Sequence, residues 1–253
     1  MKSITHERRK QQSDYLDQHY DRRGHHFSSV LADSALLERF YYDLRYISYI
    51  KEARIPFKTD PSLNKVEVDE SDANSLKFLL LYKPLHLFLG GNRIILPDEE
   101  KDYAGLPTLA YSKALKEIIP EKDWYQTGEV SRFLISKERS QICFEHLKKF
   151  DDSLTLRKIE EQKLITLMLT CSQACQKKNL NILIFSLEKA LIKLLQKNDI
   201  LLIPTNEDIE YHGNVQTAVL YFDRALEHIK KCNPALLDFY LSQPSSNSQS
   251  EFY

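Results

Sequence analysis

The stretch LNILIF, residues 180–185, decides how we expect this chain to fold. It is apolar at every position but one, which is typical of a strand buried on both faces of a sheet. Residues 154–178 before it carry the longest helical pattern in the chain, with apolar side chains at three- and four-residue steps. Before that helix, residues 129–135 are rich in β-branched and aromatic residues and predict another strand. Together these segments predict one central strand–helix–strand crossover.

Outward from this crossover, the chain shows hairpin and helix patterns. Toward the N-terminus we expect a helix over 36–47 that is capped within 32–34, strands at 65–68, 76–82 and 85–96, and a helix over 108–119. The pair Gly90-Gly91 marks a bulge or bend in the third of these strands. Toward the C-terminus we expect a helix from a Ser186 cap through 197, strands at 200–203 and 217–222, and helical pieces at 223–231 and 235–241. This order predicts a mixed α/β (α+β) fold with a central, mostly antiparallel sheet flanked by helices.

The length of 253 residues fits one domain with additional segments at its two ends. Residues 1–28 are polar and rich in His, Arg and Gln, so we expect a loosely ordered arm. Residues 29–241 would form the single domain, and residues 242–253 a flexible tail, because they are poor in apolar side chains.

Composition and charge exclude several classes of protein. A net charge of -1 argues against bulk electrostatic binding of nucleic acid. No apolar run reaches the roughly 18–20 residues of a membrane-spanning helix, and no apolar segment follows the basic N-terminus as in a secretory signal. The four cysteines fit neither a disulfide framework nor a paired zinc motif. We therefore expect no metal site and a reducing, cytoplasmic setting.

Five short motifs stand in order along the chain: LRYISY at 44–49, VDESD at 68–72, GGNRIILP at 90–97, GEVSRF at 128–133 and EYHG at 210–213. In this order and spacing they resemble the branch of the GNAT acyltransferase superfamily that contains acyl-homoserine-lactone synthases and N-acyl amino acid synthases, including acyltransferases associated with the PEP-CTERM/exosortase system. The resemblance spans roughly residues 35–240. It implies a GNAT-like fold and the transfer of a fatty acyl group from a thioester carrier to the amine of an amino acid or similar small molecule.

The chain departs from that pattern in three places. Ile55 stands where lactone synthases usually carry Trp, which lowers the case for a lactone product, and Tyr49 replaces a Phe. SKERSQ, residues 136–141, replaces the glycine-rich pyrophosphate loop. Lys137 and Arg139 could hold the single phosphate of a carrier-linked phosphopantetheine by charge, so acyl carrier protein is favoured over coenzyme A as the donor. No tightly bound cofactor is expected. The alternatives are an acyl-homoserine-lactone synthase and a non-catalytic protein that binds an acyl carrier or a lipid.

Glu129 is the candidate general base, because an ammonium must lose a proton before it can attack a thioester. On a regular strand Glu129, Ser131 and Phe133 share one face, so Ser131 would face the reacting carbonyl beside Glu129. Arg132 would then support the site from the other side. The alternative is that Glu129 is an ordinary carboxylate facing solvent.

The remaining candidates would bind the two substrates. Asp69 and Asp72 would hold the acceptor's ammonium, unless they cap a turn. Arg45 and Arg93 would bind an acceptor carboxylate or pair with those acids, and the resemblance places Tyr49 beside them. Backbone N–H groups near 131–134 would meet the oxyanion if the strand splays from its neighbour. The residues proposed to line the acyl slot are Phe133, Leu134, Phe144, Ile182, Ile184 and Phe185.

Overall fold

A seven-stranded sheet with the order β1-β2-β3-β4-β5-β7-β6 forms the centre of the molecule. The computed structural model describes residues 26–53, 66–149, 153–176, 178–210, 213–234 and 236–238. Among the described strands, β4 and β5 pair in parallel, and every other neighbouring pair is antiparallel. The predicted mixed, mostly antiparallel sheet is therefore confirmed. The strands are β1 (Phe27–Leu31), β2 (Ser75–Tyr82), β3 (Leu87–Ile95), β4 (Thr127–Ile135), β5 (Ile182–Leu187), β6 (Ile203–Glu210) and β7 (Asn214–Tyr221).

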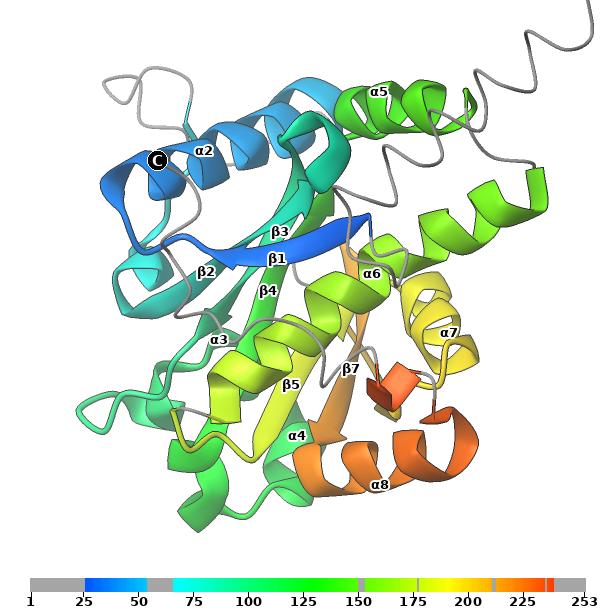
Figure 1. The fold of residues 1–253 in the computed structure, drawn as a ribbon. Coiled ribbons are helices and arrows are strands. Elements are labelled where there is room, and N and C mark those ends of the chain that lie inside the picture. Colours follow the sequence, from blue (N-terminus) through cyan, green and yellow to red (C-terminus); the bar gives the residue numbers. More distant parts are fainter. Residues whose placement is uncertain are drawn as a thin grey trace, which may run out of the picture.

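The predicted central crossover joins β4 to β5 through two helices, α5 (Lys137–Leu147) and α6 (Ser153–Gln176). Figure 1 shows α6 lying across the sheet, with α7 (Lys189–Lys197) and α8 (Phe222–Cys232) beside it. Apolar side chains of the strands and of these helices form one buried cluster, which includes Val130, Leu183 and Met168. We call this side of the sheet the α6 face.

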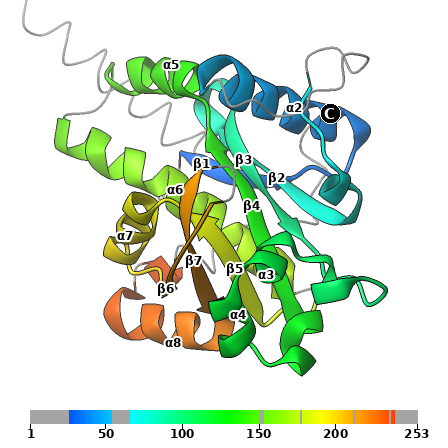
Figure 2. The same cartoon turned by 180° about the vertical axis from the view of Figure 1, so that it is seen from behind.

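The opposite side of the sheet, which we call the α3 face, carries α3 (Pro107–Tyr111) and α4 (Lys113–Ile118), as Figure 2 shows. Their apolar side chains pack with Ile95, Ile184 and Val219 of the sheet. Helix α2 (Ala35–Arg45) packs on the same face farther along, where Tyr41 meets Leu79. Each face of the sheet is thus covered by its own helices.

Several predicted elements differ from the structure. The N-terminal strand β1 was not predicted, and its first two residues fall within the predicted polar arm. Helix α5 was also not predicted, because its apolar positions are few. Val66, Glu67 and Val68 form no strand, and Lys65 lies outside the described residues. The predicted helix over 108–119 divides at Ser112, whose side chain accepts a hydrogen bond from the N–H of Leu115 and so begins a second helix.

The C-terminal half differs in its boundaries. Ser186 belongs to β5 and pairs with Thr217, so the cap position of α7 is Glu188 and not Ser186. Residues 200–202 form no strand, and β6 begins at Ile203. The strand predicted over 217–222 is β7, which begins earlier and ends at Tyr221, and the helix predicted over 223–231 is α8, which begins at Phe222.

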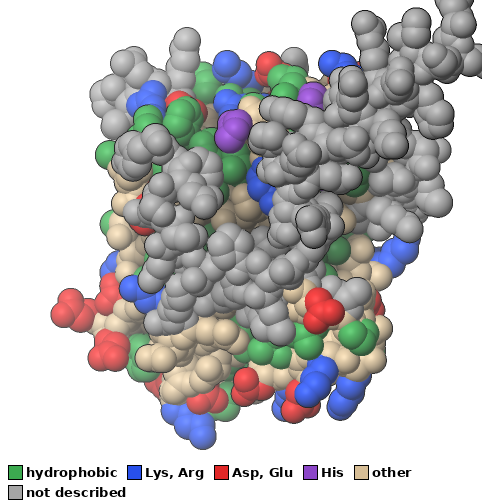
Figure 3. Space-filling view, in the orientation of Figure 1, with side chains coloured by type: hydrophobic (Ala, Val, Ile, Leu, Met, Phe, Trp, Pro, Cys, Tyr) green, Lys and Arg blue, Asp and Glu red, His purple; other side chains and the backbone are tan. Residues whose placement is uncertain are grey.

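Charged side chains of both signs lie on the face that Figure 3 shows. Figure 3 shows acidic and basic side chains intermixed along the lower part of the α6 face. Among the described residues, no helix combines the length and apolar character needed to cross a bilayer. The same part of the chain holds no group of three His, Cys, Asp or Glu side chains placed to bind a metal ion.

Helix α2 approaches the sheet closely because Gly91 has no side chain. A Cβ atom at Gly91 would lie 2.3 Å from the carbonyl oxygen of Phe78 and 3.1 Å from the ring of Tyr41. The first of these atoms belongs to the backbone of the neighbouring strand, so it cannot move away by a side-chain rotation. The predicted irregularity at the glycine pair is confirmed by shifts of register on both sides of β3.

Gly91→Ala should therefore destabilise the protein by about 1–3 kcal/mol, as overpacking of a close-packed interior does. The free energy of unfolding in urea measures this change. Asn214→Ala is the control, because Asn214 is an exposed residue at the start of β7 and should change stability by less than about 0.5 kcal/mol. Equal stability of the two variants would mean that β2 moves freely away from β3.

Candidate active site

Six buried or half-buried charged side chains meet beside the sheet at the end of α2. Three are guanidinium groups and three are carboxylates, so their formal charges cancel. We call this group the charge network. It consists of Arg45, Glu67, Asp69, Asp72, Arg93 and Arg132.

Arg45 is the last residue of α2, where the helix widens into a π-helix (Tyr46–Glu52). Its Nε donates a short hydrogen bond to Glu67, and its Nη1 donates to Oδ1 of Asp72 at 2.6 Å. The rings of Tyr41 and Tyr42 lie 5.4 and 5.7 Å from the guanidinium carbon. Because Arg45 is fully buried, these partners replace the water that the cation has lost.

Arg93 of β3 joins the network to β4. Its Nε donates to Oγ of Ser131 at 2.8 Å, and its Nη1 donates to Asp69 and, at 2.8 Å, to Asp72. Asp69 and Asp72 also form a capping box at the start of a short 3-10 helix (Glu70–Asn74). The alternative of turn capping for the two aspartates and the alternative of ion pairing for Arg45 and Arg93 are therefore both realised.

Arg132 faces the charge network, contrary to the expectation from strand alternation. Its Nη2 donates to Asp69 at 2.7 Å and to Glu67 at 3.2 Å, and its guanidinium carbon lies 5.9 Å from the ring of Tyr49. The cause is an irregularity in the β3–β4 pair at this point, where Arg132 takes the left-handed conformation with φ of 52°. The same irregularity turns Phe133 to the α6 face, so it does not share a face with Glu129.

Asp69 is the most accessible carboxylate of the charge network, with 26% of its side chain exposed. Burial alone would raise the pKa of this acid. The hydrogen bond and charge of Arg93, with the charges of Arg132 and Arg45, outweigh burial and hold the pKa of Asp69 below its ordinary value. Asp69 is therefore anionic at neutral pH and already paired with arginine.

Glu129 of β4 is buried on the α3 face, with 1% of its surface exposed. Its two oxygens accept hydrogen bonds from the N–H of Thr108 at 2.7 Å and from Oγ1 of Thr108 at 2.9 Å. Burial raises the pKa of the Glu129 carboxyl to about 7, while the Thr108 hydrogen bonds and the charges of Arg93 and Arg132 oppose that rise. The alternative of a solvent-facing carboxylate at this position is wrong.

Strands β4 and β5 part immediately beyond Glu129. Their parallel register ends at Val130 opposite Phe185. Strand β4 continues to pair with β3 as far as Ile135, and β5 continues to pair with β7 as far as Leu187. The central pair of strands therefore diverges within the sequence motif GEVSRF, after its third residue, Val130.

The residues proposed to line an acyl slot are divided among three places. Phe133, Phe144 and Phe185 belong to the cluster on the α6 face. Ile182 and Ile184 pack on the α3 face, on the same side as Glu129, and Leu134 packs against α2. A single slot on one face cannot be lined by all six.

The N-terminus of α5 is occupied by a carboxylate from the chain itself. Glu52, at the end of the π-helix, accepts hydrogen bonds from Oγ of Ser136 at 2.8 Å, the N–H of Lys137 at 2.8 Å and the N–H of Glu138 at 3.1 Å. Lys137 is exposed, and Arg139 donates to the carbonyl oxygen of Phe88 at 2.9 Å. Lys137 and Arg139, the two predicted phosphate ligands, therefore lie at the N-terminus of α5, where the backbone N–H groups of Lys137 and Glu138 already donate to Glu52.

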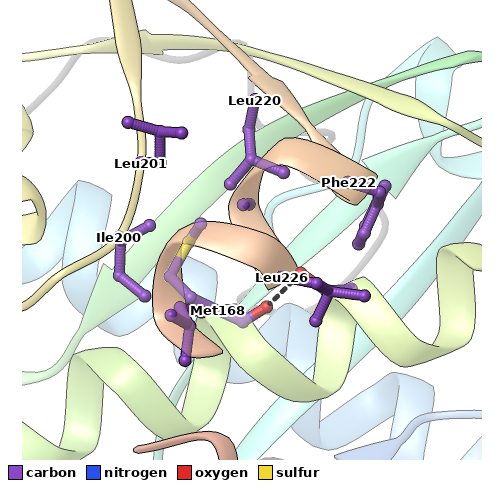
Figure 4. A pocket seen from close by; sticks show the side chains of 9 residues that line it. Met168, Ile200, Leu201, Leu220, Phe222 and Leu226 are labelled. Carbon is purple, nitrogen blue, oxygen red and sulfur yellow. Dashed lines mark hydrogen bonds between the residues drawn. The ribbon is translucent and has the colours of Figure 1, made fainter. Parts of the chain in front are cut away.

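A small apolar cavity of about 20 Å³ lies on the α6 face, between α6, α8 and β7. Figure 4 shows Met168, Leu220 and Leu226 among the side chains around it. A second, wider hollow lies at the surface between Leu85 and α5. Neither is lined by Glu129 or by any member of the charge network, so both are separate from the candidate site.

Three residues of the site carried no sequence signal that we recognised. Glu67 stands between two valines and was placed in a predicted strand. Thr108 follows Pro107 at a helix start, where threonine is ordinary. Glu52 ends an irregular helix. Each acquires its role through contacts with residues at least 21 positions away, which local patterns do not reveal.

The chain has the GNAT-like fold of solved acyl-homoserine lactone synthases. BjaI, a coenzyme A-dependent acyl-homoserine lactone synthase solved with SAM and isopentyl-CoA, superposes with a TM-score of 0.55 and 15% identity over 88% of this chain and 92% of its own. TofI, solved with an inhibitor and MTA, gives 0.51 and 13% over 83% and 99%. The synthase LasI gives 0.53 and 12% over 79% and 91%. At such identities the likeness establishes the fold. Searches of family models and of curated proteins found no match.

Arg45→Leu should destabilise the protein by about 3–5 kcal/mol, because it leaves Glu67 and Asp72 buried without their main cation. The free energy of unfolding in urea measures the loss. Arg39→Leu is the matched control, since Arg39 lies on the same helix in an exposed pair with Asp43 and should cost at most about 0.5 kcal/mol. Similar losses in both variants would contradict a structural role of the charge network.

Glu129→Gln should stabilise the protein at high pH more than at low pH. The pKa of Glu129 rises from 4.5 to about 7 on folding, so the native state holds a proton that the unfolded state has lost between these values. Wild-type stability therefore falls as pH rises through this window, whereas glutamine does not titrate. Tm values at about pH 5 and about pH 8 test this: the advantage of the variant over wild type should grow between them. If the difference in Tm between the variant and the wild type is the same at both pH values, folding does not raise the pKa of the Glu129 carboxyl.

Proposed function

We propose that this protein is an N-acyltransferase that moves a fatty acyl group from a thioester carrier to the amine of an amino acid or similar small molecule. One observation carries the proposal: a buried carboxylate whose pKa lies near neutrality stands beside the point where the two central strands part. The fold shared with acyl-homoserine lactone synthases supports the same class of chemistry.

Glu129 would serve as the general base. The attacking amine arrives as an ammonium, which has no lone pair until it loses a proton. A base with a pKa near the working pH is both ionised in a useful fraction and strong enough to accept that proton. Burial raises the pKa of Glu129 to about 7, whereas an ordinary glutamate has a pKa near 4.5 and would be a weaker base.

The parting of β4 and β5 would join a polar half-site to an apolar one. Glu129 and the charge network lie on the α3 face, whereas Phe133 and Phe185 pack on the α6 face. A polar acceptor is best held on the first side and a hydrocarbon tail on the second, because each then keeps its favoured surroundings. Beyond Val130, the backbone of β4 no longer pairs with β5 and offers N–H donors to a thioester oxyanion.

The charge network would position the acceptor from its accessible side. Asp69 is its most exposed member, and Arg132 and Tyr49 lie beside it. Arg45, Asp72 and Arg93 are buried and bonded to one another, so they would act by holding Asp69 and Arg132 in place. Ser131, bonded to Arg93, would link this arrangement to the strand that carries Glu129.

The donor would be an acyl carrier protein in preference to coenzyme A. The backbone donors at the start of α5, which suit a diphosphate, are taken by Glu52, and like charges would repel. A carrier protein can instead be held by contacts between the two proteins. The four cysteines all lie in the described part of the chain and form no disulfide bond, which supports a reducing, cytoplasmic setting for such a donor.

The second candidate is acyl-homoserine lactone synthesis. BjaI and LasI, which share this fold, are synthases of that kind. BjaI was solved with SAM. Ile55, which stands in the place of the usual Trp of lactone synthases, lies outside the described residues. The product therefore distinguishes the two candidates.

The experiment is mass spectrometry of lipids from bacteria that express the full chain, followed by assays of the purified protein. Purified protein is given acyl-coenzyme A or acyl carrier protein thioesters with a panel of amino acids. An N-acyl amino acid supports the proposal, and an acylated lactone supports the second candidate. Glu129→Gln should lower the rate by roughly a hundredfold or more.

The matched control is Glu188→Gln, because Glu188 is an exposed glutamate before α7 and should leave the rate unchanged. Faster transfer from the carrier protein than from coenzyme A supports the proposed donor. Full activity of Glu129→Gln, or the absence of any acylated product from the wild type with every donor, would overturn the proposed function.

A further inference from the structure

Glu129 has no direct path to a substrate amine. Its surface is 1% exposed, and both of its oxygens are occupied by Thr108. A general base must lie within hydrogen-bond reach of the proton it takes, directly or through an intervening group. The proposed function therefore requires something to connect this carboxylate with the place where β4 and β5 part.

The hydroxyl of Thr108 makes such a connection. Besides its bond to Glu129, Oγ1 of Thr108 lies 2.7 Å from Oγ of Ser186. An ionised carboxylate can only accept, so Thr108 donates its one hydroxyl proton to Glu129. Ser186 must then donate to Thr108. The three side chains form a directed chain from Ser186 through Thr108 to Glu129.

Ser186 stands at the correct end of this chain. It is the first residue of β5 beyond the last pair with β4, which joins Phe185 to Val130. Its side chain is half-buried, whereas Thr108 is fully buried. The hydroxyl of Ser186 is therefore the member of the chain that lies nearest to solvent and to the opening between the strands.

We infer that Ser186 and Thr108 form a proton relay that carries the amine proton to Glu129, an inference that rests on the proposed acyl transfer. The ammonium N–H gives its proton to Oγ of Ser186, the proton of Ser186 passes to Oγ1 of Thr108, and the proton of Thr108 passes to Oε1 of Glu129. One N–H bond is broken and one carboxyl O–H bond is formed. The amine is left with its lone pair, and both hydroxyls end neutral.

The two hydroxyls act differently, which makes them separable by experiment. Thr108 touches the carboxylate, and its hydrogen bonds lower the pKa of Glu129 against the effect of burial. The charges of Arg93 and Arg132 act in the same direction and stay in place when Thr108 is changed. Ser186 has no bond to Glu129, so its loss should interrupt proton transfer while affecting the ionisation of Glu129 less.

The first test is an NMR titration of the Glu129 side chain in protein labelled with carboxyl-¹³C glutamate, with Glu129→Gln used to assign the signal. Thr108→Val should raise the Glu129 midpoint measurably above that of the wild type, and Thr108→Ser should restore it. Ser186→Ala should move it by less than half as much as Thr108→Val. This titration requires no turnover, so it stands apart from the proposed function. An unchanged midpoint in Thr108→Val overturns the chain.

The second test is the rate of thioester consumption with the best donor and acceptor found for the wild type. Ser186→Ala should lower kcat by roughly tenfold or more with little change in the KM of the donor, and Ser186→Thr should recover most of the rate because it keeps a hydroxyl. An active wild type with an equally active Ser186→Ala variant overturns the relay alone. A wild type that consumes no thioester overturns the proposed function, and the relay with it.

Discussion

Two buried arginine side chains and a third half-buried one are accommodated beside this sheet because three carboxylates accompany them. A guanidinium group removed from water without a partner would cost several kcal/mol, more than a domain of this size can easily offset. The network that meets this requirement also ties four segments together, since Arg45 ends α2, Asp69 and Asp72 precede β2, Arg93 lies in β3, and Arg132 lies in β4. The position of each segment beside Glu129 follows from that set of bonds.

The sequence patterns predicted the sheet and its crossover because those features depend on long apolar runs. They failed where a local rule was broken by tertiary contact. Alternation along a strand predicted that Arg132 would point away from Ser131, yet the irregular pairing with β3 turns Arg132 toward Asp69. A left-handed residue in a strand costs about 1–2 kcal/mol, and the two carboxylates that Arg132 reaches offset this strain.

Five of the six residues of the charge network come from the short, ordered motifs, and the structure brings these five together. The motif resemblance could not place Glu67, Thr108 or Glu52, which stand outside those motifs. Helix α5 illustrates the same limit: its capping depends on Glu52, a residue 84 positions before Ser136. Patterns of a few residues contain no information on contacts of that separation, so the environment of Glu129 had to come from the structure.

The burial of Glu129 has opposite effects on the stability of the protein and on the proposed function. A carboxylate that ionises only near neutral pH reduces the stability of the native state at the pH where the proposed reaction needs it as a base. Thr108 moderates this conflict, since its two hydrogen bonds favour the ionised form without exposing the carboxylate to water. In the proposed reaction, complete burial means that the proton arrives through neighbouring hydroxyls, and the hydroxyl nearest the parting strands on that path is Ser186. The same burial that raises the pKa of Glu129 is thus the reason why the proposed reaction needs a path for the proton.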